Sequence, residues 1–307
     1  MKKIIIVGGA GYLGYNLCQF YKKIYKVILI DNFLTSVVEK KIIKDLKVYD
    51  VDVADYDVLK KIFKNNKPDI VIHSAASYSD SNNWKRDLST NTLGTINLIK
   101  LCEQFGIEKF IYFQTSNCYG KTTLKKLHES LPYNPNSSYA ISKSSAEQYL
   151  TVSKLPFVSL RLGIVYGPWH FSGPIPKFYH NLKKNKKSII VNSFRQFLYM
   201  DDFLTLINKI LNQNVKKENI LNVSSDELVS IKDLYSKIKK IIKPTKDFYE
   251  IKKSVENDIK SVPLDIKSVN QVYNWYPLIK INKGLKKQIQ WYEENDIGKS
   301  YSHLKIS

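Results

Sequence analysis

The stretch IIIVGGAGYLG, residues 4–14, decides the fold of this chain of 307 residues. Its apolar start is typical of a buried strand, and the glycines that follow permit a tight turn. Residues 16–26 then show helical spacing, and residues 27–31 (VILID) resume an apolar run. Strand, glycine turn, helix and strand in this order predict the first βαβ unit of a parallel sheet.

The glycines of the turn fit two related patterns. Gly9, Gly11 and Gly14 match G-x-G-x-x-G, while Gly8, Gly11 and Gly14 match G-x-x-G-x-x-G. Glycine allows backbone N–H groups to approach a pyrophosphate closely at the N-terminus of the following helix. In a βαβ setting the pattern therefore predicts a dinucleotide site.

Asp31 ends the second strand of this unit, where its carboxylate would accept hydrogen bonds from the adenosine ribose. A carboxylate at this place repels the 2′-phosphate of NADP. No arginine follows nearby. The sequence therefore predicts NAD as the cofactor rather than NADP.

Apolar, β-branched runs recur along the first half of the chain with helical segments between them. This alternation predicts an α/β fold with a doubly wound parallel sheet of the Rossmann type. The expected strands are 47–51 and those beginning at 69, 109 and 157, and the expected helices are 56–66, 91–105 and 139–152.

Composition narrows the class of protein. No apolar run is long enough to cross a membrane, and the first residues lack the features of a signal peptide, so we expect a cytoplasmic protein. Cys18, Cys102 and Cys118 have no metal-ligand spacing, so we expect no metal. The net charge is +20, but only three of the 48 basic residues are arginines. Because base and phosphate recognition favour arginine, we expect no nucleic-acid partner.

The heptapeptide SSYAISK, residues 137–143, places Tyr139 and Lys143 four residues apart at the start of an expected helix. Positions i and i+4 share a helix face, so the lysine could stabilise a phenolate beside it. The spacing alone is common in a chain with 21 tyrosines and 48 basic residues. It gains meaning from the other motifs.

Taken in order, these motifs resemble the extended short-chain dehydrogenase/reductase family, most closely nucleotide-sugar epimerase-like enzymes of bacterial O-antigen clusters. The resemblance covers nearly the whole chain. It rests on GGAGYLG (8–14), DNF (31–33), VDVAD (51–55), VIHSAA (71–76), NTLGTINL (91–98), QTSNCYG (114–120), YAISK (139–143), LRLGIVYGP (160–168), RQFLYMDDF (195–203) and WYPLIKINKGLKKQIQWY (275–292).

This resemblance implies a domain organisation for the chain. We expect residues 1–165 and 196–225 to form the NAD-binding Rossmann domain. Residues 166–195 and 226–307 are then expected to form a smaller mixed α/β domain for a nucleotide-diphosphate sugar. The resemblance also implies a homodimer, paired through the helices 91–105 and 139–152.

The resemblance further implies a catalytic trio. Tyr139 would be the acid/base, and Lys143 would bind the nicotinamide ribose and lower the pKa of the tyrosine. A phenol becomes a useful base near neutral pH only if its anion is stabilised. Thr115 would hydrogen-bond the reacting sugar oxygen, with Ser116 as a substitute for that role.

Other positions carry over as expected binding residues. Arg195 matches an arginine that grips the substrate diphosphate, for which a bidentate fork is well suited. His73 is expected to be a structural residue at a strand end. The expected cofactor contacts are Gly8, Gly11, Tyr12, Leu13, Gly14, Asp31, Asn32, Asp52, Val53, Ala75, Ala76 and Asn91, besides Tyr139 and Lys143, and the expected substrate contacts are Tyr78, Ser116, Asn117 and Arg195.

Two positions depart from the family pattern. Ile164 stands where the family has an asparagine, which removes a polar contact expected near the sugar nucleotide. Asp258 lacks the neighbouring arginine of the family's R-P-G-D pattern.

Within the family the residues beside Thr115 discriminate between reactions. A 4,6-dehydratase carries Asp-Glu there, whereas this chain has Ser116 and Asn117. A 3,5-epimerase/4-reductase needs a cysteine at the Asn117 position and a histidine at the Trp169 position. A 4-epimerase needs no further acid or base. The sequence therefore favours a 4-epimerase, and leaves the other two reactions and a non-catalytic dinucleotide-binding sensor or scaffold as alternatives. The resemblance alone implies UDP-hexoses, UDP-N-acetylhexosamines or UDP-uronic acids as its substrates.

Overall fold

The computed structural model describes residues 1–307 except 79, 123, 214–217, 254–261 and 296–307. The chain divides into two compact units. Unit 1 comprises residues 1–120, 129–162 and 207–222, and unit 2 comprises residues 121–128, 163–206 and 223–307.

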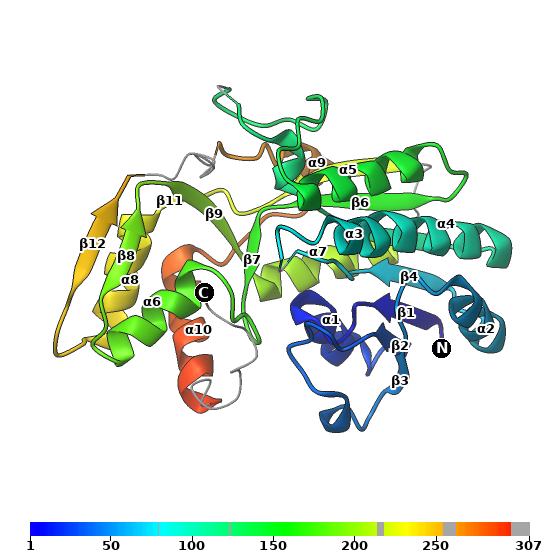
Figure 1. The fold of residues 1–307 in the computed structure, drawn as a ribbon, viewed down its shortest axis with the longest axis horizontal. Helices are drawn as coiled ribbons and strands as arrows, with labels where there is room; N and C mark the ends of the chain where they lie inside the picture. The colour runs from blue at the N-terminus through cyan, green and yellow to red at the C-terminus, as the bar shows by residue number, and fades with distance from the viewer. Residues whose placement is uncertain (79, 123, 214–217, 254–261, 296–307) are drawn as a thin grey trace. The chain divides into compact units, whose positions relative to one another are not determined.

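Unit 1 is built on a seven-stranded sheet with the strand order β10-β6-β5-β4-β1-β2-β3 (Figure 1). The pairings from β6 through β3 are all parallel. The order reverses at β1, which is the topology of a doubly wound sheet. The strands are β1 (Lys3–Val7), β2 (Lys26–Asp31), β3 (Lys47–Asp50), β4 (Ile70–His73), β5 (Lys109–Thr115), β6 (Phe157–Leu162) and β10 (Glu218–Val223).

Helices connect these strands, and one of them contains a π-helical turn directly before a regular α-helix. Such turns often mark functional sites. The helical elements of unit 1 are α1 (Tyr12–Tyr21), η1 (Lys40–Ile42), α2 (Tyr56–Asn66), α3 (Trp84–Asp87), the π-helix η2 (Leu88–Leu93), α4 (Gly94–Phe105), η3 (Ser116–Tyr119) and α5 (Ser138–Thr151).

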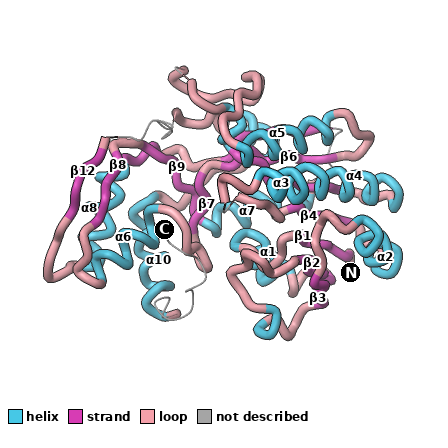
Figure 2. The backbone as a smooth tube through the Cα atoms, in the orientation of Figure 1, coloured by secondary structure: helices cyan, strands magenta, loops and turns pink. Residues whose placement is uncertain are grey.

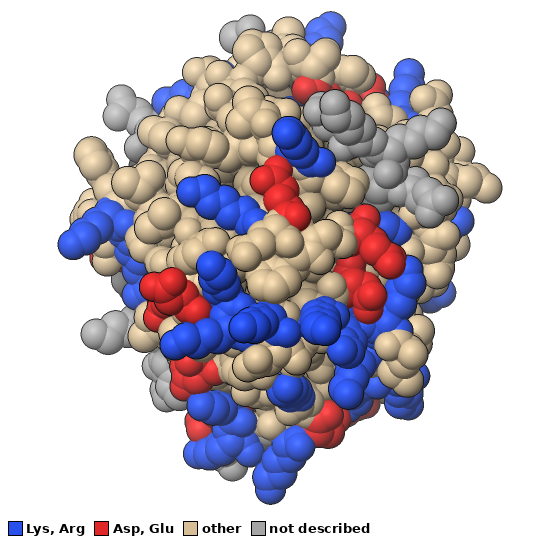
Figure 3. All heavy atoms as spheres, turned by 90° about the vertical axis from the view of Figure 1, so that its right-hand side faces the viewer, with Lys and Arg blue, Asp and Glu red and all other residues tan. Residues whose placement is uncertain are grey.

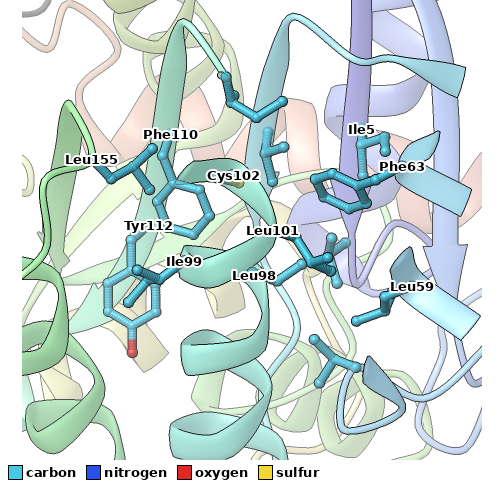
Figure 4. Packing of buried hydrophobic residues seen from close by; sticks show 14 of the residues in the cluster. Ile5, Leu59, Phe63, Leu98, Ile99, Leu101, Cys102, Phe110, Tyr112 and Leu155 are labelled. Carbon is cyan, nitrogen blue, oxygen red and sulfur yellow. The ribbon is translucent and has the colours of Figure 1, made fainter. Parts of the chain in front are cut away.

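The core of unit 1 lies between the sheet and the helices α2, α4 and α5. Successive residues of a strand face opposite sides of a sheet. Ile5 therefore packs with Phe63 and Leu98 in this layer (Figure 4), while its neighbours Ile4 and Ile6 face the other side and are equally inaccessible to solvent. Burial on both faces explains why β1 is continuously apolar.

The structure confirms the predicted fold class and most of the predicted elements. The expected helix 56–66 is α2, and the expected strand 47–51 is β3 with one residue less. The expected helix 91–105 is composite, because its first residues belong to η2 and α4 begins at Gly94. Side-chain hydrogen bonds of Asn91, described below, accompany this change of helical type.

Unit 2 contains a three-stranded sheet of order β11-β9-β7 and a separate parallel pair, β12-β8. Helices dominate the rest of the unit (Figure 2). Its elements are β7 (Ile164–Tyr166), α6 (Pro174–Lys183), β8 (Ser188–Val191), β9 (Phe194–Tyr199), β11 (Leu228–Ser230), α8 (Ile231–Ile242), β12 (Tyr249–Lys252), α9 (Lys267–Tyr273) and α10 (Ile281–Glu294), and α7 (Met200–Asn212) begins in unit 2 and ends in unit 1.

The surface carries the excess of lysine as a mixture of charges. On the face shown in Figure 3, basic side chains are numerous and acidic side chains lie among them. Exposed ion pairs such as Lys40–Asp50, with a nitrogen–oxygen distance of 3.2 Å, are part of this mixture. Within the described ranges, no helix has both the length and the apolar character needed to cross a membrane.

Candidate active site

The glycine turn between β1 and α1 is packed too tightly for side chains. A Cβ atom on Gly8, whose φ is +76°, would lie 2.3 Å from the backbone nitrogen of Ala75, and one on Gly14 would lie 2.1 Å from the carbonyl oxygen of Gly8. Gly11 is the N-cap of α1. The turn thus leaves its backbone bare at a helix N-terminus, which fits the pyrophosphate of a dinucleotide.

Asp31 lies at the carboxyl end of β2 and closes this turn. Its carboxylate accepts hydrogen bonds from the backbone N–H of Ala10 at 2.9 Å and of Phe33 at 2.8 Å. Burial raises the pKa of Asp31, and these backbone hydrogen bonds oppose the rise. Asp31 therefore has a structural role in the turn besides the ribose contact predicted for it.

The other predicted cofactor residues lie around the same edge of the sheet. The side chain of Asn32, after β2, donates to the carboxylate of Asp52, after β3, at 2.7 Å. Val53 is buried against the Cα of Gly94, where a Cβ atom would lie 2.4 Å from a methyl group of the valine. Tyr12 and Leu13 begin α1, and Ala75 and Ala76 follow β4.

Asn91 connects the loop after β4 to helix α5. Its side-chain oxygen accepts from the backbone N–H of Ser77 at 2.8 Å. Its amide nitrogen donates to the carbonyl of Ser77 and to the hydroxyl of Ser142, both at 2.9 Å. Asn91 thus fixes the loop that carries Tyr78 against the helix that carries Tyr139, which the sequence alone did not indicate.

Thr115 and Tyr139, both expected in the catalytic trio, lie together in the structure. Thr115 ends β5, and its hydroxyl accepts from the backbone N–H of Asn117 at 3.2 Å. Burial raises the pKa of Tyr139, while a hydrogen bond with the Thr115 side chain opposes that rise. Tyr78, which is exposed, packs edge-on against Tyr139 with ring centroids 6.1 Å apart.

Lys143 is almost fully buried, at 1% exposed. Burial lowers its pKa to about 7, and the carboxylate of Glu147, one turn along α5, acts in the opposite direction. The ammonium lies 3.9 Å from the centre of the Tyr112 ring. A lysine whose charge changes near neutral pH is typical of an active site.

The remaining predicted substrate residues are in different parts of the chain. Ser116 and Asn117 belong to η3 in unit 1, half-buried and exposed respectively. Arg195 belongs to β9 of unit 2, where its guanidinium donates to the carbonyl of Phe194 at 2.7 Å. Ile164 begins β7 of unit 2, and Asp258 lies outside the described residues.

Sequence reasoning missed two polar clusters beside this site. One joins Tyr112 and Gln114 of β5 to Lys143, and the other joins Glu147 of α5 to Arg161 of β6. The available signal was alternation, since residues 112 and 114 must face the same side of a strand. Among the described residues, no group of three or more acidic, His or Cys side chains could hold a metal ion.

Comparison with known proteins places this geometry in a family. The model of the NAD dependent epimerase/dehydratase family matches residues 4–224, and the chain belongs to that family. Its similarity to solved structures includes the Bordetella bronchiseptica enzyme WbmG in complex with NAD and UDP. The two chains are 33% identical with a TM-score of 0.91, over 98% of this chain and 96% of the other.

Curated relatives of comparable identity carry names for two different reactions. A human dTDP-D-glucose 4,6-dehydratase is 30% identical, with 96% of this chain and 91% of the relative covered. A putative UDP-glucose 4-epimerase of Methanocaldococcus jannaschii is 29% identical, with 95% of this chain and 99% of the relative covered. The predicted family and the predicted cofactor NAD are confirmed, and the protein is an enzyme of the epimerase/dehydratase class.

Proposed function

We propose that this protein is an NAD-dependent nucleotide-sugar 4-epimerase. The observation that carries the proposal is the pairing of Thr115, Tyr139 and Lys143 with a following turn, η3, whose sequence Ser-Asn-Cys-Tyr holds no carboxylate. Epimerisation at C4 needs one proton-transfer group that works in both directions, and the site offers a tyrosine for it.

The proposed roles follow from the chemistry of each side chain. The Tyr139 oxygen takes the proton of the C4 hydroxyl and returns it after the 4-keto sugar has turned its other face. The Thr115 hydroxyl, which is already hydrogen-bonded to Tyr139, forms a hydrogen bond with the reacting sugar oxygen. The Lys143 ammonium stabilises the phenolate. NAD, when bound to the glycine turn, supplies a reversible hydride acceptor.

A 4,6-dehydratase is the second candidate, because a relative with that name is 30% identical. Elimination of water across C5 and C6 needs an acid and a base beside the sugar. Ser116 and Asn117 supply neither, which is why we favour epimerisation. A 3,5-epimerase/4-reductase is disfavoured because Asn117 and Trp169 occupy the positions of its cysteine and histidine.

One experiment separates these candidates. The purified protein is incubated with UDP-, GDP-, CDP- and dTDP-linked sugars, with UDP-hexoses, UDP-N-acetylhexosamines and UDP-uronic acids first, and the products are followed by NMR. A 4-epimerase inverts C4 and leaves C6 unchanged. A dehydratase leaves a ketone at C4 and converts C6 to a methyl group. Binding without turnover across the panel would favour the non-catalytic sensor or scaffold.

The choice of NAD over NADP is proposed to rest on Asp31. A carboxylate held by Ala10 and Phe33 cannot turn away from a 2′-phosphate without losing those hydrogen bonds. Fluorescence titration should therefore show tighter binding of NADH than of NADPH. Tighter NADPH binding would refute the role of Asp31.

We further propose that Arg195 binds the substrate diphosphate. Arg195→Leu should then raise KM for the sugar nucleotide at least tenfold and leave NADH affinity unchanged, since a charge-assisted contact to phosphate is worth about 1.5–3 kcal/mol. Arg195→Lys keeps the charge but loses the bidentate guanidinium, so its KM should lie between those of the parent and of Arg195→Leu. An unchanged KM for Arg195→Leu would remove Arg195 from the substrate site.

A homodimer is proposed from an apolar stripe on unit 1. Ile141 of α5 and Val152, which follows that helix, are 54% and 80% exposed. Tyr149 of α5 and Leu93 of η2 are also exposed. Light scattering should show a dimer at micromolar concentration, and Ile141→Glu with Val152→Glu should give monomers. Ile24→Glu, at an exposed apolar residue elsewhere, is the matched control.

A further inference from the structure

Strand β5 presents two side chains to the helix that carries Lys143. The hydroxyl of Tyr112 and the amide nitrogen of Gln114 both donate to the carbonyl of Lys143, at 3.2 Å and 2.8 Å. The amide oxygen of Gln114 accepts from the backbone N–H of Thr115 at 2.7 Å. One strand face therefore holds the main chain of Lys143 and is continuous with Thr115.

The ring of Tyr112 also meets the charged end of Lys143. The ammonium lies 3.9 Å from the ring centre. Tyr112 is 0% exposed and Lys143 is 1% exposed. An ammonium removed from water loses its hydration and becomes easier to deprotonate. The negative face of an aromatic ring attracts a cation and opposes that loss most strongly where water is absent.

Among the described residues, the Tyr112 ring and one carboxylate are the groups that favour the charged form of Lys143. Glu147 is that carboxylate, one turn along α5. His73 of β4 packs against Tyr112 with ring centroids 5.6 Å apart. Burial and the neighbouring Lys143 hold the pKa of His73 well below its usual value, so the imidazole is neutral at pH 7.

The protonation of this neutral histidine can be assigned from its hydrogen bonds. The Thr95 hydroxyl donates to the carbonyl of Asn91 at 2.6 Å and lies 3.0 Å from Nε2 of His73. The hydroxyl therefore accepts from His73, whose proton is on Nε2. Burial holds the pKa of Tyr112 well above its usual value, so its ring also stays neutral. Phe110 projects from the same side of β5 and packs on this cluster (Figure 4).

We propose that Tyr112 is a positioning residue whose ring face keeps Lys143 protonated and in place, one turn along α5 from Tyr139. The proposal rests on the function proposed above, in which the lysine must be charged to stabilise the phenolate. It assigns the task to the ring rather than to the phenolic hydroxyl, and this distinction makes it testable.

The first experiment measures Lys143 itself, without substrate. Protein with 13Cε-labelled lysine is titrated by NMR, and Lys143 is identified as the signal missing from Lys143→Met. Tyr112→Phe keeps the ring and should leave the titration midpoint within a few tenths of a unit. Tyr112→Leu removes the ring and should lower the midpoint by about one and a half units, because a desolvated cation–π contact is worth about 2 kcal/mol and one pKa unit about 1.4 kcal/mol.

A second variant guards against a folding defect in Tyr112→Leu. Trifluorophenylalanine at position 112 has nearly the shape of phenylalanine but a much weaker negative ring face. It should lower the Lys143 midpoint in the same direction, with an unfolding transition like that of Tyr112→Phe. If the fluorinated ring and the plain ring gave the same midpoint, the ring face would have no electrostatic role and the proposal would fail.

The second experiment measures turnover against pH for the best substrate of the panel. Activity needs the protonated lysine, so the alkaline limb of the kcat profile should move down by about one unit in the fluorinated variant and stay in Tyr112→Phe. A shift of the NMR midpoint without a shift of this limb would support the effect of the Tyr112 ring on Lys143. It would refute the role of Lys143 in the proposed reaction. The two proposals can thus fail separately.

Discussion

Helix α5 carries two buried side chains, Lys143 and Glu147, one turn apart, and their surroundings differ. Glu147 is inaccessible to solvent, and Lys143 is nearly so. The Arg161 guanidinium donates twice to one oxygen of Glu147, at 3.0 Å and 2.9 Å. The hydroxyls of Tyr133 and Ser159 donate to the same carboxylate.

Lys143 is surrounded differently. Its ammonium meets a ring face, and burial brings its pKa to about 7. By contrast, burial acts to lower the pKa of Arg161, but the neighbouring Glu147 outweighs it and raises that pKa above its ordinary value, so the guanidinium stays charged. A satisfied buried pair fixes a structure, whereas an incompletely compensated charge can gain or lose a proton. The comparison predicts different effects for variants at Tyr139 and Lys143, which we call the reactive cluster, and at Glu147, Arg161 and Tyr133, which we call the structural cluster.

The largest effect is expected on turnover at the reactive cluster. Tyr139→Phe should fold, bind NADH and the sugar nucleotide, and lose roughly 10²–10⁴-fold in kcat, the usual worth of one positioned proton-transfer group. The measurement is kcat on a substrate that the parent epimerises. Turnover near that of the parent would show that Tyr139 is not the proton-transfer group, and the predicted difference between the two clusters would then be wrong.

At the structural cluster the loss should be in stability. Arg161→Met leaves Glu147 buried without its cation and should cost about 3–5 kcal/mol of unfolding free energy, measured by urea denaturation at pH 7. The double variant Glu147→Gln with Arg161→Met removes both charges and should recover part of that loss. A double variant less stable than Arg161→Met would show that the charge on Glu147 is not the cause.

Removal of the Lys143 charge should raise the unfolding free energy, whereas Arg161→Met should lower it. Because burial depresses the pKa of Lys143 from 10.5 to about 7, the unfolded chain binds a proton that the native chain lacks between these pH values. The parent therefore gains stability from this group as pH rises through that window. Lys143→Met lacks this dependence and should be more stable than the parent by roughly 1–3 kcal/mol at pH 7.

The check is urea unfolding of both proteins between pH 7 and 10. The advantage of Lys143→Met should shrink as pH rises, because the parent then buries a neutral amine. A constant difference across the range would mean that the folded chain keeps the proton of Lys143 as the unfolded chain does, so that burial does not depress the pKa of this lysine.

The smallest effect concerns one hydrogen bond of the structural cluster. Tyr133→Phe removes the 2.8 Å hydrogen bond to Glu147 but leaves both contacts from Arg161. We expect a loss of about 1–2 kcal/mol of unfolding free energy and no change in kcat. Tyr56→Phe, which removes an exposed hydroxyl contact 3.5 Å long, is the matched control and should change neither.

Local patterns in the sequence were sufficient for the sheet, the glycine turn and the placing of Tyr139 and Lys143 one turn apart on one helix. Each depends on residues close together in the chain, such as the glycines of residues 8–14 or the i and i+4 positions of one helix. The family resemblance added Thr115, which the structure brings into contact with Tyr139. The roles of these residues stay predictions.

The tertiary structure alone decided the surroundings of Lys143. Tyr112 and Gln114 face α5 because strand alternation and parallel pairing put them there, and Arg161 reaches Glu147 from another strand. These contacts join residues many positions apart, and no local propensity encodes them. The sequence by itself determined the fold class and singled out Lys143, whereas burial, which only the packed chain creates, brought the pKa of that lysine to about 7.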